Sequence, residues 1–179
     1  ILVLGDSISA GYGLEKADQG WVALLRDKVA PRGLSVVNAS ISGETSAGGL
    51  ARIDDLLARH RPSIVILELG GNDGLRGLSP KELESNLAAL IGRSKTAGAK
   101  VLLLGMKIPP NYGKRYADLF REVYPELSKR EAVALVPFLL EGVGGQNQMM
   151  QPDGIHPNRE AQPALLAQVW SQLEGMLRK

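Results

Sequence analysis

Short apolar runs recur along the chain and predict five buried strands. Each run is rich in Val, Ile or Leu, and all but one are free of charged residues. Such runs are typical of a parallel sheet that is covered on both faces. The predicted strands are residues 1–4, 34–37, 64–69, 101–104 and 132–136.

Between these runs, apolar residues recur every three or four positions and predict five amphipathic helices that pack on the core. Ser79-Pro80 gives the third helix a start signal, and Gly98 gives it a stop signal. The apolar stripes comprise Trp21, Leu24 and Leu25; Leu50, Ile53, Leu56 and Leu57; Leu83, Leu87, Leu90 and Ile91; Tyr116, Leu119, Phe120, Val123 and Leu127; and Leu165, Val169, Leu173 and Met176.

Strands that alternate with helices predict an α/β fold, a three-layer α/β/α sandwich around a five-stranded parallel sheet. Right-handed crossovers favour a flavodoxin-like strand order of 2-1-3-4-5. The 179 residues suffice for one full core, and neither a repeat nor a linker divides them. We therefore expect a single domain over residues 1–179.

The composition narrows the classes of function. The chain has 21 Lys and Arg against 19 Asp and Glu and no basic cluster, so we expect no nucleic-acid partner. No apolar run approaches the roughly 18 residues of a membrane span. The lack of cysteine excludes disulfides, thiolate catalysis and Cys-based metal sites. Ile1 falls inside a predicted strand, so we expect a Met and a few residues before it, which is compatible with a cleaved export signal.

A serine follows the first predicted strand, in Gly5-Asp6-Ser7. Open α/β sheets bind ligands at the carboxyl ends of their strands, so Ser7 is well placed as a nucleophile, although a serine there also serves to cap a helix. His156 can accept the proton of such a hydroxyl. Asp153, three residues earlier, can fix the tautomer of the imidazole and balance its charge. These residues predict a catalytic triad of Ser7, His156 and Asp153.

Two further blocks supply donors for an oxyanion. Gly43 follows the second predicted strand, and Asn72 follows the third in Gly70-Gly71-Asn72-Asp73. The backbone N–H groups of Ser7 and Gly43 and the side-chain amide of Asn72 together predict a three-donor oxyanion hole. A glycine at position 43 lets the backbone approach a substrate without a Cβ in the way.

Other interpretations of these residues remain open. Asp153 and His156 have the spacing of a metal pair, but the only other histidine, His60, has the context of a solvated helix end, so we expect no metal. Asp73 also suits a capping role. Glu68 is unusual in an apolar strand, and we favour a paired structural carboxylate over a catalytic one.

The rival class of function is a binding module with a phosphate cradle at Gly5–Gly13, where two serines and several glycines gather. This loop lacks the Gly-Lys-Ser/Thr of a P-loop and the Gly-x-Gly-x-x-Gly of a dinucleotide site. A cradle would also give no role to Asn72 or to Asp153 and His156.

Taken together, the blocks resemble the SGNH hydrolases, also called GDSL esterases/lipases, whose four marker residues map to Ser7, Gly43, Asn72 and His156. The longer stretches that resemble the bacterial TesA-type subgroup of thioesterase I, lysophospholipase and arylesterase are residues 69–77, 110–113 and 154–158. The resemblance covers nearly the whole chain.

The resemblance implies a cofactor-free mechanism with an acyl-enzyme on Ser7. The implied substrates are esters and thioesters, among them acyl-CoA, lysophospholipids, aryl esters and short-to-long acyl esters. A carbohydrate O-acetyl esterase of the same family is the alternative. The resemblance also implies a periplasmic location, and we expect a monomer whose partner is a small-molecule substrate.

Apolar residues on two loops of the predicted catalytic rim suggest where an acyl chain binds. Glycines at 74 and 77 loosen the first loop, and Pro80 fixes its far end, so we expect a flap that closes over the chain. The predicted substrate-binding residues are Leu75 and Leu78 on this loop, and Ile108, Pro110 and Tyr112 on the loop after the fourth strand.

Overall fold

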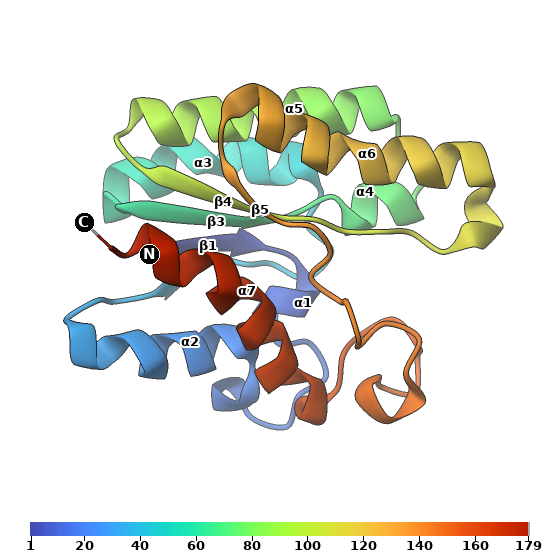
Figure 1. The fold of residues 1–179 in the computed structure, drawn as a ribbon, viewed down its shortest axis with the longest axis horizontal. Coiled ribbons are helices and arrows are strands. Elements are labelled where there is room, and N and C mark those ends of the chain that lie inside the picture. Colours follow the sequence, from blue (N-terminus) through green and yellow to red (C-terminus); the bar gives the residue numbers. More distant parts are fainter. Residues whose placement is uncertain (179) are drawn as a thin grey trace.

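The computed structural model describes residues 1–178 and shows a parallel sheet between two layers of helices (Figure 1). The five strands lie in the order β2-β1-β3-β4-β5, and every neighbouring pair is parallel. The predicted fold class and strand order are therefore confirmed. The strands are β1 (Leu2–Gly5), β2 (Val37–Asn38), β3 (Ile64–Glu68), β4 (Lys100–Leu104) and β5 (Ala134–Val136).

Helices cover both faces of the sheet. In the described part of the chain they are α1 (Ser7–Ala10), α2 (Trp21–Val29), α3 (Ser46–His60), α4 (Gly71–Leu75), α5 (Pro80–Thr96), α6 (Lys114–Glu131) and α7 (Gln162–Met176). Figure 1 shows α2 and α7 on one face and α3, α5 and α6 on the other. The short helices α1 and α4 lie at the end of the sheet where β1 and β3 finish.

The central strands form the most deeply buried part of the core. Leu2, Val3 and Leu4 of β1 are fully buried, and every residue of β3 is buried. Full burial of such a side chain contributes about 1.5–3 kcal/mol. Strands β1 and β3 are therefore held firmly in the core, and they fix the starting points of the loops that follow them.

Parallel pairing places the ends of neighbouring strands at one edge of the sheet. Gly5, the last residue of β1, pairs with Glu68, the last residue of β3. On the other side of β1, the backbone N–H of Ile41 donates to the carbonyl of Gly5 at 3.0 Å. The loops that begin at Asp6, after Asn38 and after Glu68 are thus neighbours.

Three predicted strands differ from the observed ones by one residue at one or both ends, and the second and fifth differ by more. The second strand contributes only Val37–Asn38 to the sheet, while Leu34 and Val36 pack against the core outside the ladder. This strand lies at the edge and pairs only with Leu2 and Val3, so few partners are available to it. The fifth strand begins at Ala134 because Ala132 ends α6 in a left-handed conformation, with φ of 52°.

The sequence patterns missed two helices and placed one residue incorrectly in the core. The helices α1 and α4 span about one turn each, which is too short for a periodic apolar stripe. Leu119 was placed on the core face of its helix, but its side chain is 46% exposed. The buried face of α6 is formed by Phe120, Val123, Tyr124 and Leu127 instead.

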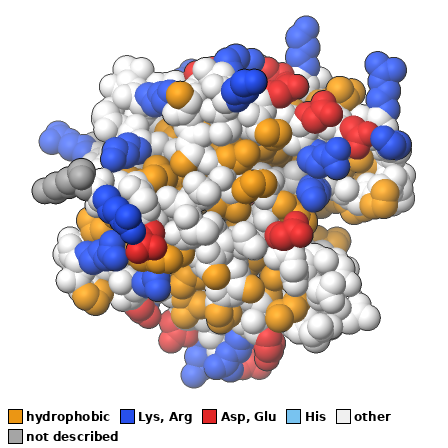
Figure 2. Space-filling view, viewed as in Figure 1, with side chains coloured by type: hydrophobic (Ala, Val, Ile, Leu, Met, Phe, Trp, Pro, Cys, Tyr) orange, Lys and Arg blue, Asp and Glu red, His pale blue; other side chains and the backbone are white. Residues whose placement is uncertain are grey.

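No helix within residues 1–178 combines the length and apolar character needed to cross a membrane. The surface carries charges of both signs. On the face shown in Figure 2, basic and acidic side chains lie close together around the edge.

Candidate active site

Ser7, His156 and Asp153 form one continuous hydrogen-bonded chain. The Ser7 hydroxyl donates to Nε2 of His156 at 2.9 Å, and Nδ1–H of His156 donates to Oδ2 of Asp153 at 2.6 Å. These directions hold for the imidazole tautomer with its hydrogen on Nδ1. The structure thus joins residues that are 149 positions apart in the chain into a nucleophile, a base and an orienting carboxylate.

Asp153 is held in its ionised form by donors of its own loop. Its Oδ1 accepts hydrogen bonds from the backbone N–H groups of His156 at 3.0 Å and Ile155 at 2.9 Å. Hydrogen bonds from the backbone and then from the ring of His156 lower the pKa of Asp153 from 3.8 to about 2. The carboxylate therefore stays negative at neutral pH and can stabilise an imidazolium.

Ser7 begins the one-turn helix α1 directly after β1. Asp6 precedes it as the N-cap, and its Oδ1 accepts from the backbone N–H of Ile8 at 3.0 Å. Gly11 ends the turn in a left-handed conformation, with φ of 80°. The Ser7 side chain is half-buried, which leaves it open to substrate.

A second set of contacts aligns the proposed oxyanion donors. The Asn72 side-chain amide donates one hydrogen to the carbonyl of Glu44 at 2.9 Å, which ties α4 to the loop after β2. The same nitrogen carries a second hydrogen. Gly43 has φ of 83°, a conformation that side chains with a Cβ rarely adopt. The backbone conformation therefore favours glycine at position 43, in addition to the expected approach of substrate to this N–H group.

The backbone N–H groups of Ser7 and Gly43 suit the role of donors. Ser7 is the first residue of α1, and the first N–H groups of a helix have no partner within it. Within residues 1–178, neither N–H donates to another protein group. Both lie on loops next to each other at the carboxyl edge of the sheet.

Asp73 has a structural role rather than a chemical one. It is buried, and its carboxylate accepts from the backbone N–H of Ser46 at 2.8 Å and from the Ser46 hydroxyl at 2.7 Å. Ser46 begins α3, so Asp73 binds the first turn of that helix. The capping interpretation is favoured by these contacts.

The predicted substrate-binding residues divide into an exposed group and a buried one. Leu75 and Leu78 are 37% and 39% exposed, and Tyr112 and Pro110 are exposed as well. Ile108 is buried behind them. The Tyr112 hydroxyl donates to the carbonyl of Leu75 at 2.8 Å, so the two loops are joined.

The 73–80 segment, where a flap is expected, is partly helical and is hydrogen-bonded to α6. Its first residues belong to α4, and the Tyr116 hydroxyl donates to the carbonyl of Leu78 at 2.6 Å. The reason given for Gly74 was wrong: a Cβ there would lie 2.3 Å from Ile108 and 2.8 Å from Phe120. Gly74 permits close packing, whereas Gly77, with φ of 69°, forms a turn.

Sequence reasoning missed Tyr12 and Gln151. The ring of Tyr12 packs on the imidazole of His156, with ring centroids 4.5 Å apart. The Gln151 side-chain amide donates to the carbonyls of Tyr12 at 2.7 Å and Pro157 at 3.0 Å. Gln151 thus ties the nucleophile loop to the histidine loop. Gly13 is the one hint of this contact in the sequence, and the structure explains it: a Cβ at position 13 would collide with the Gln151 side chain.

The phosphate-cradle interpretation does not fit this geometry. The Ser9 side chain is buried, and its hydroxyl donates to Oε1 of Glu68 at 2.7 Å. The buried carboxyl groups of Asp6 and Glu68 lie against the same loop, and a phosphate there would meet negative charge.

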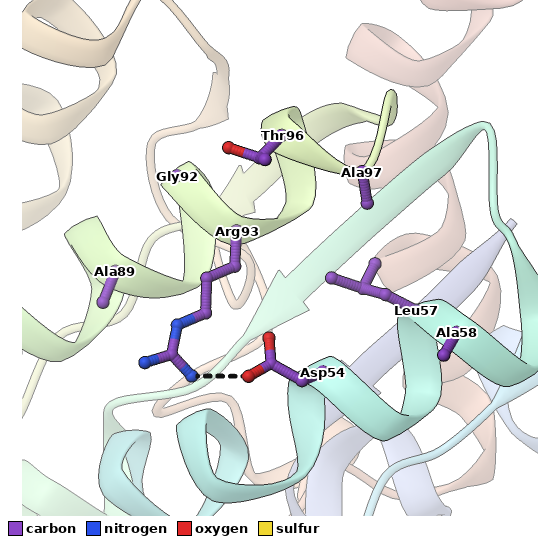
Figure 3. A pocket seen from close by; sticks show the side chains of 8 residues that line it. All are labelled: Asp54, Leu57, Ala58, Ala89, Gly92, Arg93, Thr96 and Ala97. Carbon is purple, nitrogen blue, oxygen red and sulfur yellow. Dashed lines mark hydrogen bonds and ion pairs between the residues drawn. The ribbon is translucent and has the colours of Figure 1, made fainter.

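A surface hollow of about 610 Å³ lies elsewhere, between α3 and α5 (Figure 3). It is lined largely by Leu, Ala and Gly residues, and Arg93 forms an ion pair with Asp54 at 3.0 Å. These residues lie in the second halves of the two helices, whereas α3 begins near the site. None of its lining residues is a serine or a histidine, and it is separate from the Ser7 site.

A profile of the GDSL-like Lipase/Acylhydrolase family matches residues 3–163. The chain belongs to this family. It is 57% identical over 179 residues to the esterase TesA of Pseudomonas aeruginosa, covering 99% of this chain and 89% of that protein. It is 49% identical over 177 residues to thioesterase 1/protease 1/lysophospholipase L1 of Escherichia coli, covering 99% and 84%.

The solved structures agree with the sequences. The esterase EstA of Pseudoalteromonas sp., in a structure inhibited by monoethylphosphonate, is 41% identical, covers 99% of this chain and 98% of that chain, and superimposes with a TM-score of 0.93. These comparisons confirm the prediction of an SGNH hydrolase and of an esterase of the TesA type.

Proposed function

We propose that this GDSL-family hydrolase cleaves carboxylic esters and thioesters through an acyl-enzyme on Ser7. The observation that carries the proposal is the unbroken chain from the Ser7 hydroxyl through His156 to Asp153, with distances of 2.9 Å and 2.6 Å. This chain supplies the nucleophile, the base and the charge that the base needs.

In the acylation step, Oγ of Ser7 attacks the acyl carbonyl while Nε2 of His156 takes the hydroxyl proton. The new C–O bond forms as the carbonyl electrons move to the oxygen. When the tetrahedral species collapses, His156 returns the proton to the leaving alcohol or thiol. Asp153 stays ionised throughout and stabilises the imidazolium.

In the deacylation step, water replaces the departed alcohol or thiol. His156 removes a proton from the water, which attacks the acyl carbonyl on Ser7. Collapse of this second tetrahedral species releases the carboxylic acid, and the proton on His156 returns to Oγ. The cycle leaves the enzyme unchanged and balances without a cofactor.

The negative oxygen of each tetrahedral species needs donors that are already aligned. We assign this role to the backbone N–H groups of Ser7 and Gly43 and to the second amide hydrogen of Asn72. The hydrogen bond from Asn72 to Glu44 keeps the amide oriented before substrate arrives. One such donor contributes on the order of 10²–10³ to kcat in other acyl-transfer enzymes.

The rim of the site is apolar, which favours substrates with an extended acyl or aryl group. Within residues 1–178, the exposed large hydrophobic side chains include one or more from the loop after every strand. Exposed apolar side chains that gather around a catalytic residue support binding of an apolar group. These side chains are Tyr12, Ile41, Leu75, Leu78, Tyr112 and Ile155.

Two of the predicted substrate-binding residues fit this rim directly. Leu75 and Leu78 are exposed and lie beside Tyr112, so we assign them to contact with the acyl chain, with Pro110 on the same wall. Ile108 supports the wall from behind. An acetyl group ends next to the carbonyl, so the acyl group of an O-acetyl ester would leave Leu75 and Leu78 unused.

Two further properties complete the proposal. All residues of the site come from a single chain, which supports action as a monomer. The likeness to the TesA-type subgroup supports a periplasmic location. Light scattering of the purified protein tests the first, and release of activity by osmotic shock of cells that make the natural full-length protein tests the second.

The substrate class is tested by one panel of acyl-CoA thioesters, p-nitrophenyl esters, lysophospholipids and acetylated sugars, each over a range of acyl lengths where the class allows. We expect kcat/KM to rise with acyl length on thioesters and aryl esters. Activity confined to acetyl groups on sugars would overturn the assignment in favour of an O-acetyl esterase.

A further inference from the structure

Two buried carboxyl groups lie against the turn that carries Ser7. Glu68 ends β3 with its side chain fully buried, and Asp6 ends up only 3% exposed at the N-cap of α1. The proposed mechanism uses neither of them. A buried carboxyl group is costly unless its oxygens are hydrogen-bonded, so both need an account.

One oxygen of Glu68 holds the nucleophile turn from the neighbouring strand. Its Oε1 accepts from the backbone N–H of Asp6 at 3.3 Å, from the backbone N–H of Ser9 at 3.2 Å and from the Ser9 hydroxyl at 2.7 Å. These donors flank Ser7 on both sides. Gly5 makes room for this arrangement, because a Cβ there would lie 2.9 Å from Oε1 of Glu68.

The other oxygen of Glu68 shows where a proton must lie. Oε2 is buried, and no donor group within residues 1–178 reaches it. The side chain of Asp6, whose backbone N–H donates to Oε1 of Glu68, is buried as well. Two carboxylates cannot share a buried site when both are ionised, so one of them retains its proton.

The surroundings place that proton on Glu68. Burial and the charge of Asp6 raise the pKa of Glu68 well above its usual range. Burial raises the pKa of Asp6 too, but hydrogen bonds from Glu68 and from the backbone N–H of Ile8, and the charge of His156, oppose that rise. Tyr124 is a further titratable group close to the pair, and burial raises the pKa of Tyr124 well above its usual range.

We propose that Glu68 is a positioning residue for Ser7: its neutral carboxylic acid donates a hydrogen bond from Oε2 to Asp6 while Oε1 binds the amides of Asp6 and Ser9. The pair then carries one negative charge, and the nucleophile turn is held from the sheet. This inference rests on the proposed role of Ser7 as nucleophile.

The consequence concerns the chemical step more than binding. Without Glu68, the N–H groups on either side of Ser7 lose their acceptor, and Oγ of Ser7 shifts relative to His156. A displacement of about 1 Å in such a group costs on the order of 10² in rate. Because Glu68 touches no substrate, KM has no reason to change.

Three variants test this. Glu68→Gln keeps the acceptor oxygen and gives Asp6 an N–H donor, so we expect kcat within about threefold of the parent. Glu68→Met keeps the volume without either function, and we expect kcat to fall by on the order of 10² with KM within about twofold. Ser94→Ala is the control. It removes a fully buried hydroxyl that donates to the Leu90 carbonyl away from the site, so it should lower thermal stability without changing kcat.

An infrared spectrum near neutral pH supplies a readout that does not depend on activity. The parent should show the carbonyl band of a protonated carboxylic acid, and Glu68→Gln should lack it. A parent spectrum without that band, or a Glu68→Gln enzyme as slow as Glu68→Met, would overturn the neutral pair. Parent-like kcat in folded Glu68→Met would overturn the positioning role.

The experiments distinguish a failure of the Glu68 role from a failure of the proposed function. If Ser7→Ala keeps full activity, the nucleophile assignment fails whatever Glu68 does. If Ser7→Ala is inactive and folded Glu68→Met behaves like the parent, only the role of Glu68 fails.

Discussion

Replacing Asn72 with Ala should separate catalysis from stability. Within residues 1–178, the Asn72 side-chain amide makes one hydrogen bond, to the carbonyl of Glu44 at 2.9 Å, and its second hydrogen is assigned to the oxyanion. The substitution removes both. The first loss acts on the folded state, and the second acts only when negative charge develops on the substrate.

The two losses differ in size. A partly buried hydrogen bond contributes about 0.5–1.5 kcal/mol to folding, which corresponds to a drop in Tm of roughly 1–6 °C for a chain of this length. Loss of one oxyanion donor lowers kcat by on the order of 10²–10³, or about 2.7–4 kcal/mol. The catalytic effect of Asn72→Ala should therefore exceed its effect on stability by about 2 kcal/mol.

The assay measures kcat and KM on a p-nitrophenyl ester, together with Tm by calorimetry. A matched control is Asn86→Ala, which removes a side-chain amide that donates to the Ser46 hydroxyl at 3.1 Å in a partly buried position on α5. We expect the control to keep kcat within about twofold of the parent.

Two results would refute this reasoning. A rise in KM with kcat unchanged would mean that Asn72 binds the ground state and the transition state equally. An equal loss of kcat in Asn86→Ala would mean that packing of the loops, and not the amide donor, controls the rate.

Four further predictions concern the triad, the acyl chain and the packing of α4. Asp153→Asn should lower kcat by on the order of 10⁴ on a folded protein, because the imidazole loses its orienting charge. The folded pKa of Asp153 is about 2, below its ordinary 3.8, so the carboxylate stabilises the fold above about pH 4 and loses this effect as the pH falls through 2. The Tm difference between parent and Asp153→Asn should narrow over that window, and a constant difference would count against the hydrogen bonds to Asp153. Along an acyl series, each buried CH₂ contributes about 0.8 kcal/mol, which is close to fourfold in kcat/KM. Leu75→Ser and Leu78→Ser should flatten this slope and leave kcat/KM on acetyl esters unchanged. Slopes parallel to that of the parent would assign both residues to the fold alone. Gly74→Ala should lower the free energy of unfolding by about 1–3 kcal/mol, because its Cβ collides with neighbouring side chains. Gly92→Ala, in open space on α5, should raise it by about 0.5–1 kcal/mol. Equal shifts in Tm for the two variants would contradict the packing argument.

The order of the strands was predictable because connection rules leave few alternatives. Alternation of strands and helices implies crossovers, and right-handed crossovers bring the ends of β1, β2 and β3 to one edge. Ser7, Gly43 and Asn72 could be grouped from the sequence for that reason alone. His156 needed a chemical argument, since the loop from β5 to α7 has no periodic pattern.

The remaining differences arise where tertiary contacts override local pattern. Leu119 satisfies the helical spacing, but α6 buries only one side against α5. Gly74 is a flexible residue by its type, yet its neighbours Ile108 and Phe120 determine its use. Glu68 was recognised as unusual, but its partners in the Ser7 turn lie 59–62 positions away and became apparent only in the structure.

The most direct test of the central claim is covalent labelling of the active protein with a fluorophosphonate, read by intact mass and peptide mapping. The account predicts one label per chain, located on Ser7, and loss of hydrolysis in proportion to labelling, with Ser7→Ala both unlabelled and inactive. Labelling of a different residue, or full activity in Ser7→Ala, would contradict the assignment of Ser7 as the nucleophile.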